Sequence, residues 1–372
     1  MEKTMQGVVE PNLQRCRSAL IALGVTGLLA ACATPAPSSQ QQKELAGAIS
    51  SPAPVQVPDL PVESPEEIAL RQLVALQDRL DRVAAPLLVN NPALCKGNAR
   101  RLLGFTAKTK YSYSDEYLQA AQKLFKLDER LQVTGVLPGS GAARVGVARG
   151  DSLIAVDDKA LPQGRNAERQ AAAILAPLVN GRANVKLTVQ RKGNTVVLDV
   201  PLTTACAFRV ELGNSDAVNA YSDGHRVLVT RGMMRYATSD QDLSYVLARE
   251  LAHNALRHPV RLRNSATIAG VIDNLIRIKP DLNMITGTAG IKPYSQEMDA
   301  AADTIGLYMA ARAGYAIERS SVFWQGLASQ YPASITNGYT ALHPSTEFRI
   351  AAIDKAKMDI RAKQSAQKTL LP

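Results

Sequence analysis

The residues with the clearest chemical potential in this chain are Arg249, Glu250 and His253, which lie in the string Arg-Glu-Leu-Ala-His. With histidine at position 249, the string would read His-Glu-x-x-His. In that pattern two imidazoles one helical turn apart hold a zinc ion, and the glutamate acts as general base toward a zinc-bound water. Arginine stays protonated and offers no lone pair to a metal. The sequence therefore predicts a metal-type site that lacks one ligand, with Glu250 as the remaining catalytic candidate.

A helix is expected to carry this string, because apolar residues recur at helical spacing from Leu243 to Leu256. Ser239 is the predicted N-cap. Upstream, the run that ends at Gly232 predicts a strand. An edge strand beside the helix could hold an extended polypeptide by main-chain hydrogen bonds. The predicted substrate edge strand consists of Arg226, Val227, Leu228 and Val229.

Further motifs occur in a fixed order along the same region. They are Asn219-Ala-Tyr221, Gly232-Met-Met234, the Arg249 string, the run from Tyr294 to Gly306, Gly314-Tyr315, and His343-Pro-Ser345 before Arg349. In these motifs the chain, from about residue 206 to residue 360, resembles the zinc metallopeptidase family that includes the CAAX prenyl protease, HtpX and BepA. The resemblance implies a metallopeptidase-like fold for this region.

The resemblance also implies a set of metal ligands. The family's third zinc ligand is a glutamate, and the aligned position here holds Asp299, whose side chain is one methylene shorter. Asp303 matches the family's trailing aspartate, which implies a role in orienting a ligand. Of the three expected ligands only His253 is unchanged. Zinc is therefore the cofactor if the site is active, and an inactive site without a cofactor is the favoured prediction.

Two interpretations of Arg249 remain open from the sequence. In the first, its guanidinium fills the metal position and pairs with Glu250 or Asp299. In the second, a rebuilt metal site uses His253, Asp299 and a third group such as His343. We favour the first, because a fixed positive charge beside the pocket opposes binding of a dication.

The N-terminus predicts export and a lipid anchor. Two arginines precede an apolar run from Ala19 to Ala31, which has the length of a signal peptide rather than of a spanning helix. The string Leu-Ala-Ala-Cys32 resembles the bacterial lipobox, in which the cysteine is lipidated. We predict a signal peptide over 1–31, lipidation of Cys32 and a disordered Pro/Ser/Gln-rich tether over 32–63. With Ala33 after the cysteine, the resemblance implies a location on the bacterial outer membrane, facing the periplasm.

Cysteine usage agrees with an oxidising compartment. Cys16 falls in the signal peptide and Cys32 takes the lipid, which leaves Cys95 and Cys206 as one pair. We predict a disulfide between them, which would join the two ends of the segment that they enclose.

The enclosed segment predicts a domain of its own. An alternating strand from Leu131 to Leu137 precedes Gly-Ser-Gly-Ala and Gly-Asp-Ser-Leu-Ile, and a hairpin closed by Lys192-Gly-Asn follows a helical stretch. In these motifs residues 128–203 resemble a PDZ domain of the HtrA type. Such domains bind the C-termini of polypeptides by strand addition beside a glycine-rich loop. Residues 127–130, before the first predicted strand, contain no glycine, so a spacer or gating role is at least as much expected.

The predicted fold class is α+β. A metallopeptidase-like helical domain with a small sheet carries an inserted, β-barrel-like PDZ domain. Its first part spans 64–127 and begins with an amphipathic helix, its second part spans 204–363, and residues 364–372 form a tail.

Charge and compartment limit the partners. The formal net charge is +10, but an exported protein is not expected to meet nucleic acid. We predict a non-catalytic binder or quality-control factor for unfolded or extended envelope proteins, attached to the membrane by its lipid. The alternatives are an active zinc-dependent metalloendopeptidase with a remodelled ligand set, and a scaffold in which the PDZ-like domain does the binding.

Overall fold

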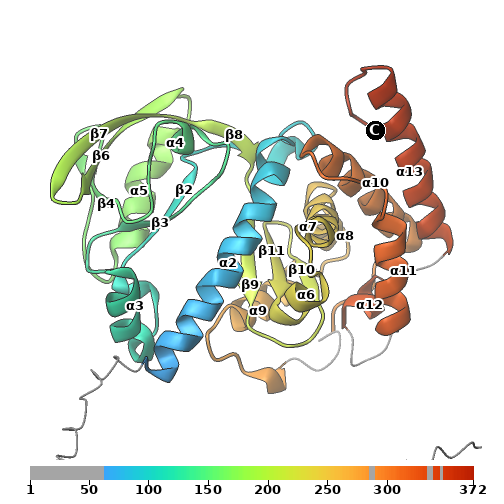
Figure 1. Ribbon diagram of the computed structural model, residues 1–372, viewed down its shortest axis with the longest axis horizontal. Coiled ribbons are helices and arrows are strands. Elements are labelled where there is room, and N and C mark those ends of the chain that lie inside the picture. The colour runs from blue at the N-terminus through green and yellow to red at the C-terminus, as the bar shows by residue number, and fades with distance from the viewer. Residues whose placement is uncertain (1–62, 285–289, 333–337, 344–346) are drawn as a thin grey trace, which may run out of the picture. The chain divides into compact units, whose positions relative to one another are not determined.

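The computed structural model describes residues 63–284, 290–332, 338–343 and 347–372 (Figure 1). The predicted signal peptide, Cys32 and the tether up to residue 62 lie outside the described residues. Helices surround a three-stranded sheet in one region, and a six-stranded sheet forms another. The fold class is therefore α+β, as predicted. Among the helices that the structure describes, none is both long and apolar enough to cross a bilayer.

Helix α2 (Pro65–Val89) is the predicted amphipathic helix. The hydroxyl of Ser64 accepts a hydrogen bond from the Glu67 amide, while the Glu67 carboxylate accepts one from the Ser64 amide. This capping box satisfies amides that a helix start leaves without partners. Leu80 and Leu87 are buried and pack into the main core with helix α7 (Asp240–Ala255). The helix thus belongs to the peptidase-like body, as expected.

The three-stranded sheet has the order β10-β11-β9. Strand β11 (Arg226–Thr230) pairs antiparallel with β10 (Ala220–Ser222) and parallel with β9 (Arg209–Gly213). The prediction that Arg226 to Val229 form an edge strand is therefore wrong. Val227, Leu228 and Val229 are all buried, and such an unbroken apolar run is typical of a strand covered on both faces.

Both edges of this sheet are covered in the described structure. The Gln77 side chain of α2 donates to the Val210 carbonyl at 3.1 Å and accepts from the Leu212 amide at 2.8 Å, so it occupies the outer edge of β9. On the other side, all three residues of β10 are buried. A partner polypeptide therefore finds no open edge at which it could add a strand to this sheet.

The remaining helices of the body follow β11. They are α6 (Arg231–Tyr236), α7, α8 (His258–Arg261), α9 (Ser265–Leu275), α10 (Gln296–Arg312), α11 (Ser320–Gln330), α12 (Gly338–Leu342) and α13 (Glu347–Ser365), with a 3-10 turn at Leu282–Met284. Ser239 caps α7 as predicted, with its hydroxyl accepting from the Asp242 amide. Every residue of α7 from Leu243 to Ala255 is buried, since α2, α10, α11 and the sheet all pack against it.

The six-stranded sheet has its own core, which includes Val133, Leu153 and Leu187. Its strands are β2 (Phe105–Lys108), β3 (Gln132–Val136), β4 (Ser152–Val156), β5 (Lys159–Ala160), β6 (Asn184–Arg191) and β7 (Asn194–Pro201), in the order β2-β3-β4-β6-β7 with β5 beside β4. Its helices are α4 (Gly141–Arg144) and α5 (Ala167–Val179). The predicted start at residue 128 is wrong, because β2 pairs antiparallel with β3. β2 was missed because it is only four residues long and lies far upstream of β3.

Residues 64–127, which were predicted to be the helical first part of the body, also contain strands. After α2 come a 3-10 turn (Lys96–Asn98), strand β1 (Ala99–Leu102), β2, two more 3-10 turns (Lys110–Ser112 and Asp115–Tyr117) and helix α3 (Leu118–Phe125). β1 pairs antiparallel with β8 (Thr203–Cys206), so the inserted segment enters and leaves through one two-stranded ribbon. At its base Cys95 and Cys206 form the predicted disulfide, with their Cα atoms 5.6 Å apart.

Candidate metal-type site

Two packed helices and one loop bring the predicted site residues together. Arg249, Glu250 and His253 lie on α7, Asp299 and Asp303 lie on α10, and His343 follows α12. Gly306 permits the close packing of α10 on α7, because a Cβ there would lie 3.1 Å from backbone atoms of Ala248 and Arg249. All six site residues are buried.

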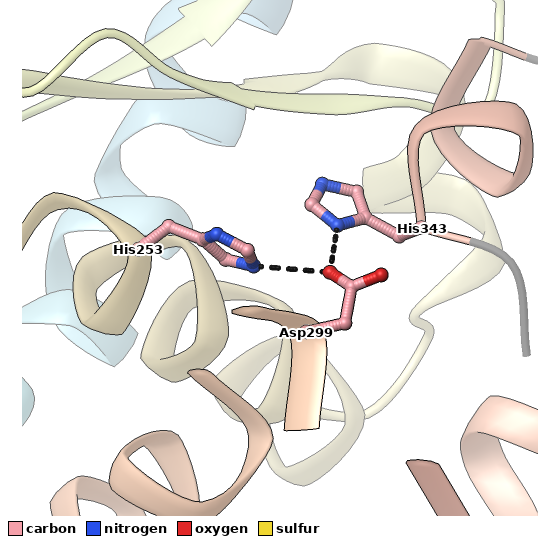
Figure 2. A group of neighbouring side chains, drawn as sticks. All are labelled: His253, Asp299 and His343. Atoms are coloured by element: carbon pink, nitrogen blue, oxygen red, sulfur yellow. Dashed lines mark hydrogen bonds and ion pairs between the residues drawn. The ribbon is translucent and has the colours of Figure 1, made fainter. Parts of the chain in front are cut away.

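Figure 2 shows the imidazole rings of His253 and His343 approaching the same carboxylate oxygen of Asp299. His343 Nδ1 lies 2.9 Å from Asp299 Oδ1, and His253 Nε2 lies 3.4 Å from the same oxygen. Each of the three residues offers a potential ligand atom within 4.8 Å of the others. His343, which the sequence suggested only as a third group, is therefore a direct member of the cluster.

Arg249 reaches into this cluster. Its Nη2 donates to Asp299 Oδ1 at 2.6 Å and lies 3.1 Å from His343 Nδ1. Burial disfavours the charge, but the carboxylates of Asp303 and Asp299 outweigh burial and raise the pKa of Arg249 above its ordinary value. Of the two partners considered for Arg249, the structure selects Asp299 and not Glu250.

Glu250 has a different partner. Its Oε2 accepts a hydrogen bond of 2.8 Å from the Ser222 hydroxyl of β10, while its Oε1 lies 3.4 Å from His343 Nε2. Burial raises the pKa of Glu250, and the charges of His253 and Arg249 oppose the rise only in part. Ser222 escaped the sequence analysis, because a lone serine in a strand gives no chemical signal.

A second buried arginine completes the charge network. Arg349 of α13 donates from Nε to Asp303 Oδ2 at 2.9 Å and from Nη1 to the His343 carbonyl at 2.8 Å. Arg249 Nε also lies 3.5 Å from Asp303 Oδ1, and both guanidinium groups lie over the ring of Trp324, at 5.0 and 5.8 Å from its centroid. Asp303 thus holds two arginines, rather than only orienting a ligand as the resemblance implied.

His258 is closer to the site than its spacing suggests. A residue five positions after His253 falls off its face on a continuous helix, but α7 ends at Ala255 and Arg257 takes a left-handed conformation with φ of 59°. The backbone therefore turns back, and His258 Nδ1 lies 3.0 Å from His253 Nδ1. Tyr294 packs on His253 and His343, with ring centroids 4.1 and 4.9 Å apart. Neither contact was predicted, because the first depends on where α7 ends and the second joins residues far apart in the sequence.

The residues present do not fit zinc in this arrangement. The three side chains of Figure 2 have the right chemistry, and Asp299 Oδ2 is buried without a hydrogen-bond partner. However, zinc bonds to oxygen and nitrogen are about 2.0–2.2 Å long. A metal bound to Asp299 Oδ1 and His343 would overlap the Arg249 guanidinium, which contacts both. It would also lie beside the fixed positive charge of Arg249, which repels a dication.

We expect the three buried histidines to lower the free energy of unfolding as the pH is lowered from 7 to 4.5. Burial lowers the pKa of His253 and His343 from 6.5 to about 4, and that of His258 to about 3. Protons then bind preferentially to the unfolded chain, so each histidine removes up to about 1.4 kcal/mol per pH unit below about pH 6.5. The raised pKa values of Glu250, of Asp303 (to about 7) and of Asp81 (to about 6) act in the opposite direction, so the net fall is expected to be far smaller than the sum for the three histidines. Urea unfolding across this range measures the net slope, and a fall as steep as the sum for the three histidines would contradict the opposing effect of the carboxyl groups.

The six-stranded sheet offers a second feature relevant to binding. β2 is an end strand of this sheet, and its residues are alternately half-buried and exposed. Leu103-Gly104 precedes it, with Gly104 at φ of 82° and its carbonyl bound by the Leu137 amide at 2.8 Å. A glycine therefore does stand before the first strand of the sheet. The doubt about binding of polypeptide C-termini rested on residues 127–130, which precede β3 and not the first strand of the sheet, β2.

Comparisons with known proteins find similarity to metallopeptidases. The sequence profile of Peptidase family M48 matches residues 184–357, slightly less than half of the chain. The chain is 27% identical over 182 residues to "Metalloendopeptidase OMA1, mitochondrial" of Bos taurus, covering 42% of this chain and 34% of that protein. It is 26% identical over 216 residues to "Beta-barrel assembly-enhancing protease" of Yersinia pestis, covering 54% of this chain and 42% of that protein. The chain thus spans less than half the length of these curated relatives.

Solved structures are also similar to this chain over part of its length. A crystal structure of the HtrA3 PDZ domain bound to a phage-derived ligand covers 28% of this chain and 88% of its own, at 17% identity and a TM-score of 0.21. The HtrA-type protease AlgW with a decapeptide covers 28% of this chain and 30% of its own, at 23% identity and a TM-score of 0.22. The PDZ interpretation of the inserted segment stays a prediction. The sequence comparisons support an M48 metallopeptidase-like region at residues 184–357, in which Arg249 stands at the first position of the zinc motif.

Proposed function

We propose that this chain is a non-catalytic, metallopeptidase-like envelope lipoprotein that binds unfolded or extended envelope proteins. The similarity to M48 peptidases supports the fold in this proposal, and the apolar N-terminal run with its Leu-Ala-Ala-Cys string supports the envelope location. The missing ligand and the covered strand edges beside Glu250 supply the reason that binding, rather than hydrolysis, is the function.

One observation carries the non-catalytic part: the guanidinium of Arg249 lies 2.6 Å from Asp299 Oδ1 and 3.1 Å from His343 Nδ1. A fixed cation inside the ligand cluster gives Asp299 and Asp303 the positive partner that a metal would otherwise supply. Without a metal, no group in this cluster can lower the pKa of an attacking water to near neutrality. Glu250, although intact, then has no activated water to deprotonate.

The purified wild-type protein is expected to contain far less than one zinc per molecule and to leave casein uncut. Metal analysis after exposure to zinc, together with a casein assay with and without chelator, tests this. Near-stoichiometric zinc with chelator-sensitive cleavage that Glu250→Gln abolishes would overturn the non-catalytic proposal.

A specific observation favours the second candidate, an active zinc endopeptidase. His253, Asp299 and His343 form a three-residue cluster with ligand atoms within 4.8 Å of one another. If Arg249 swung away from the cluster, these three residues would form the remodelled ligand set. The zinc measurement on the wild type separates the two candidates, because only this one requires the metal.

For the binding part, the edge of β2 is the feature best suited to an extended polypeptide. The neighbouring sheet of the body is covered by Gln77 on one side, whereas β2 pairs only with β3 among the described strands. Main-chain hydrogen bonds to such an edge accept many sequences. If PDZ-led binding were the whole function, removing the inserted segment would abolish client binding. Binding that survives the deletion would assign clients to the peptidase-like body.

The lipid anchor at Cys32 is part of the proposal and rests on the Leu-Ala-Ala-Cys string. Cys32→Ser is expected to shift the protein from the membrane fraction to the soluble fraction of the periplasm. Blotting of fractionated cells measures the shift, and a variant that is still lipidated at another residue would contradict the assignment.

A further inference from the structure

A compact group of cations lies on the turn after α7, which the proposed function does not use. Arg257, Arg261 and Arg263 occur within seven residues and are all exposed. Arg257 and Arg263 both take left-handed conformations, and the Arg263 amide donates to the Val260 carbonyl at 3.0 Å. The turn is therefore tight, and its three arginines occupy a small surface.

A fourth cation joins the turn from a distant part of the sequence. The Asn264 side chain donates to the Lys292 carbonyl at 2.9 Å and accepts from the Lys292 amide at 3.3 Å. The Lys292 side chain is exposed. Within this group the apolar side chain of Val260 is 41% exposed. We call Arg257, Val260, Arg261, Arg263 and Lys292 the basic patch.

No carboxylate neutralises the basic patch in the part of the protein that the structure describes. None of its four cations lies within ion-pair distance of an acidic side chain there. Asp223 and Asp273, which lie in neighbouring elements, are both bound by Arg226 at 2.8 and 2.6 Å. The patch therefore presents four charges that an external anion could meet.

We propose that the basic patch docks on an anionic phospholipid surface. Cations near such a surface are attracted by its negative potential, and an apolar side chain among them can enter the interfacial layer. Val260 favours a lipid partner over an acidic polypeptide, since an acidic polypeptide would need only the charges. The proposal goes beyond the proposed function and does not depend on the anchor at Cys32.

Docking of the basic patch would fix the orientation of the metal-type site relative to the membrane surface. His258 is the first residue of α8 and contacts His253, and the charge of Arg261, after burial and His253, is one of the causes that lower the pKa of His258. The basic patch is thus adjacent to the His253 side of the cluster. A membrane bound there would lie next to α8 and the start of α9.

The test compares two triple variants of the full-length protein. Arg257→Gln/Arg261→Gln/Arg263→Gln removes three charges from the basic patch. Arg144→Gln/Lys159→Gln/Arg169→Gln removes three exposed charges from the region of the six-stranded sheet and is the matched control. The quantity measured is the ratio of binding to vesicles of phosphatidylglycerol and phosphatidylcholine over binding to phosphatidylcholine alone. This ratio cancels any contribution from the apolar N-terminal run.

We expect the wild type and the control variant to show the same high ratio, which falls as salt is raised. Each cation near an anionic surface contributes about fivefold to binding, so the patch variant, which lacks three of them, is expected to lose about a hundredfold. Val260→Ser should lower the ratio less, and the corresponding Arg→Lys triple variant should keep it. Thermal unfolding of each variant checks that it is folded.

Several results would overturn the proposal. These are an unchanged ratio in the patch variant, an equal loss in the control variant, or a loss in the folded Arg→Lys variant. If the patch variant kept its vesicle ratio but lost binding to polyglutamate, the partner would be an acidic polypeptide and not a lipid surface.

Discussion

Protein carrying Arg249→His is expected to bind close to one zinc ion per molecule where the wild type binds almost none. The substitution removes the guanidinium from Asp299 Oδ1 and His343 Nδ1. It also places a second imidazole one turn before His253 on α7, the spacing at which two histidines hold zinc. Metal analysis of the dialysed protein measures the gain.

Arg249→His combined with Asp299→Glu is the variant most expected to regain proteolysis. It restores the full ligand set beside an intact Glu250. The matched control adds Glu250→Gln, which should keep the zinc but cleave no casein. A zinc-loaded double variant without any cleavage would show that metal loss alone does not explain inactivity. The burial of the whole site, including Tyr294, would then be the obstacle to substrate.

Replacing Arg249 by leucine is expected to lower the free energy of unfolding by about 3–5 kcal/mol, because it leaves a buried carboxylate without its partner. Arg249 and Asp299 are only 1% exposed each, so water cannot take over the role of the guanidinium. Equilibrium urea unfolding of the variant and the wild type measures the loss.

A double-mutant cycle separates this pair from general damage to the core. Arg249→Leu with Asp299→Leu should recover a large part of the loss, because burying neither charge is often as stable as burying both. Arg361→Leu, which removes an exposed arginine 3.6 Å from Glu318, is the control and should change stability by less than about 0.5 kcal/mol. Additive effects of the two leucines would contradict a direct ion pair.

The sequence predicted those parts of the site that depend on spacing along one element. Arg249, Glu250 and His253 share α7 because helical periodicity and a serine cap are local signals. The disulfide followed from counting cysteines. Asp299 was placed by motif alignment and is the partner of Arg249.

The missed features depend on tertiary structure. The Arg226–Val229 strand is central because β10 and β9 pair on its two sides. Its unbroken apolar run indicates two covered faces but does not show that a strand pairs along each edge. His258 returns to His253 only because α7 stops at Ala255. β2 belongs to the six-stranded sheet although it lies far upstream of β3, so its partner could not be read from adjacent residues.

The ribbon of β1 and β8 has a consequence for the history of this protein. The Cα atoms of Cys95 and Cys206 lie 5.6 Å apart across a sequence separation of 111 residues. A single linking residue can span that gap, since consecutive Cα atoms are about 3.8 Å apart. A genetic event that inserted or excised the intervening stretch would therefore have left α2 and the strands of the body in register. The architecture therefore allows the inserted segment to be lost or replaced without displacing the elements of the peptidase-like framework on either side of it.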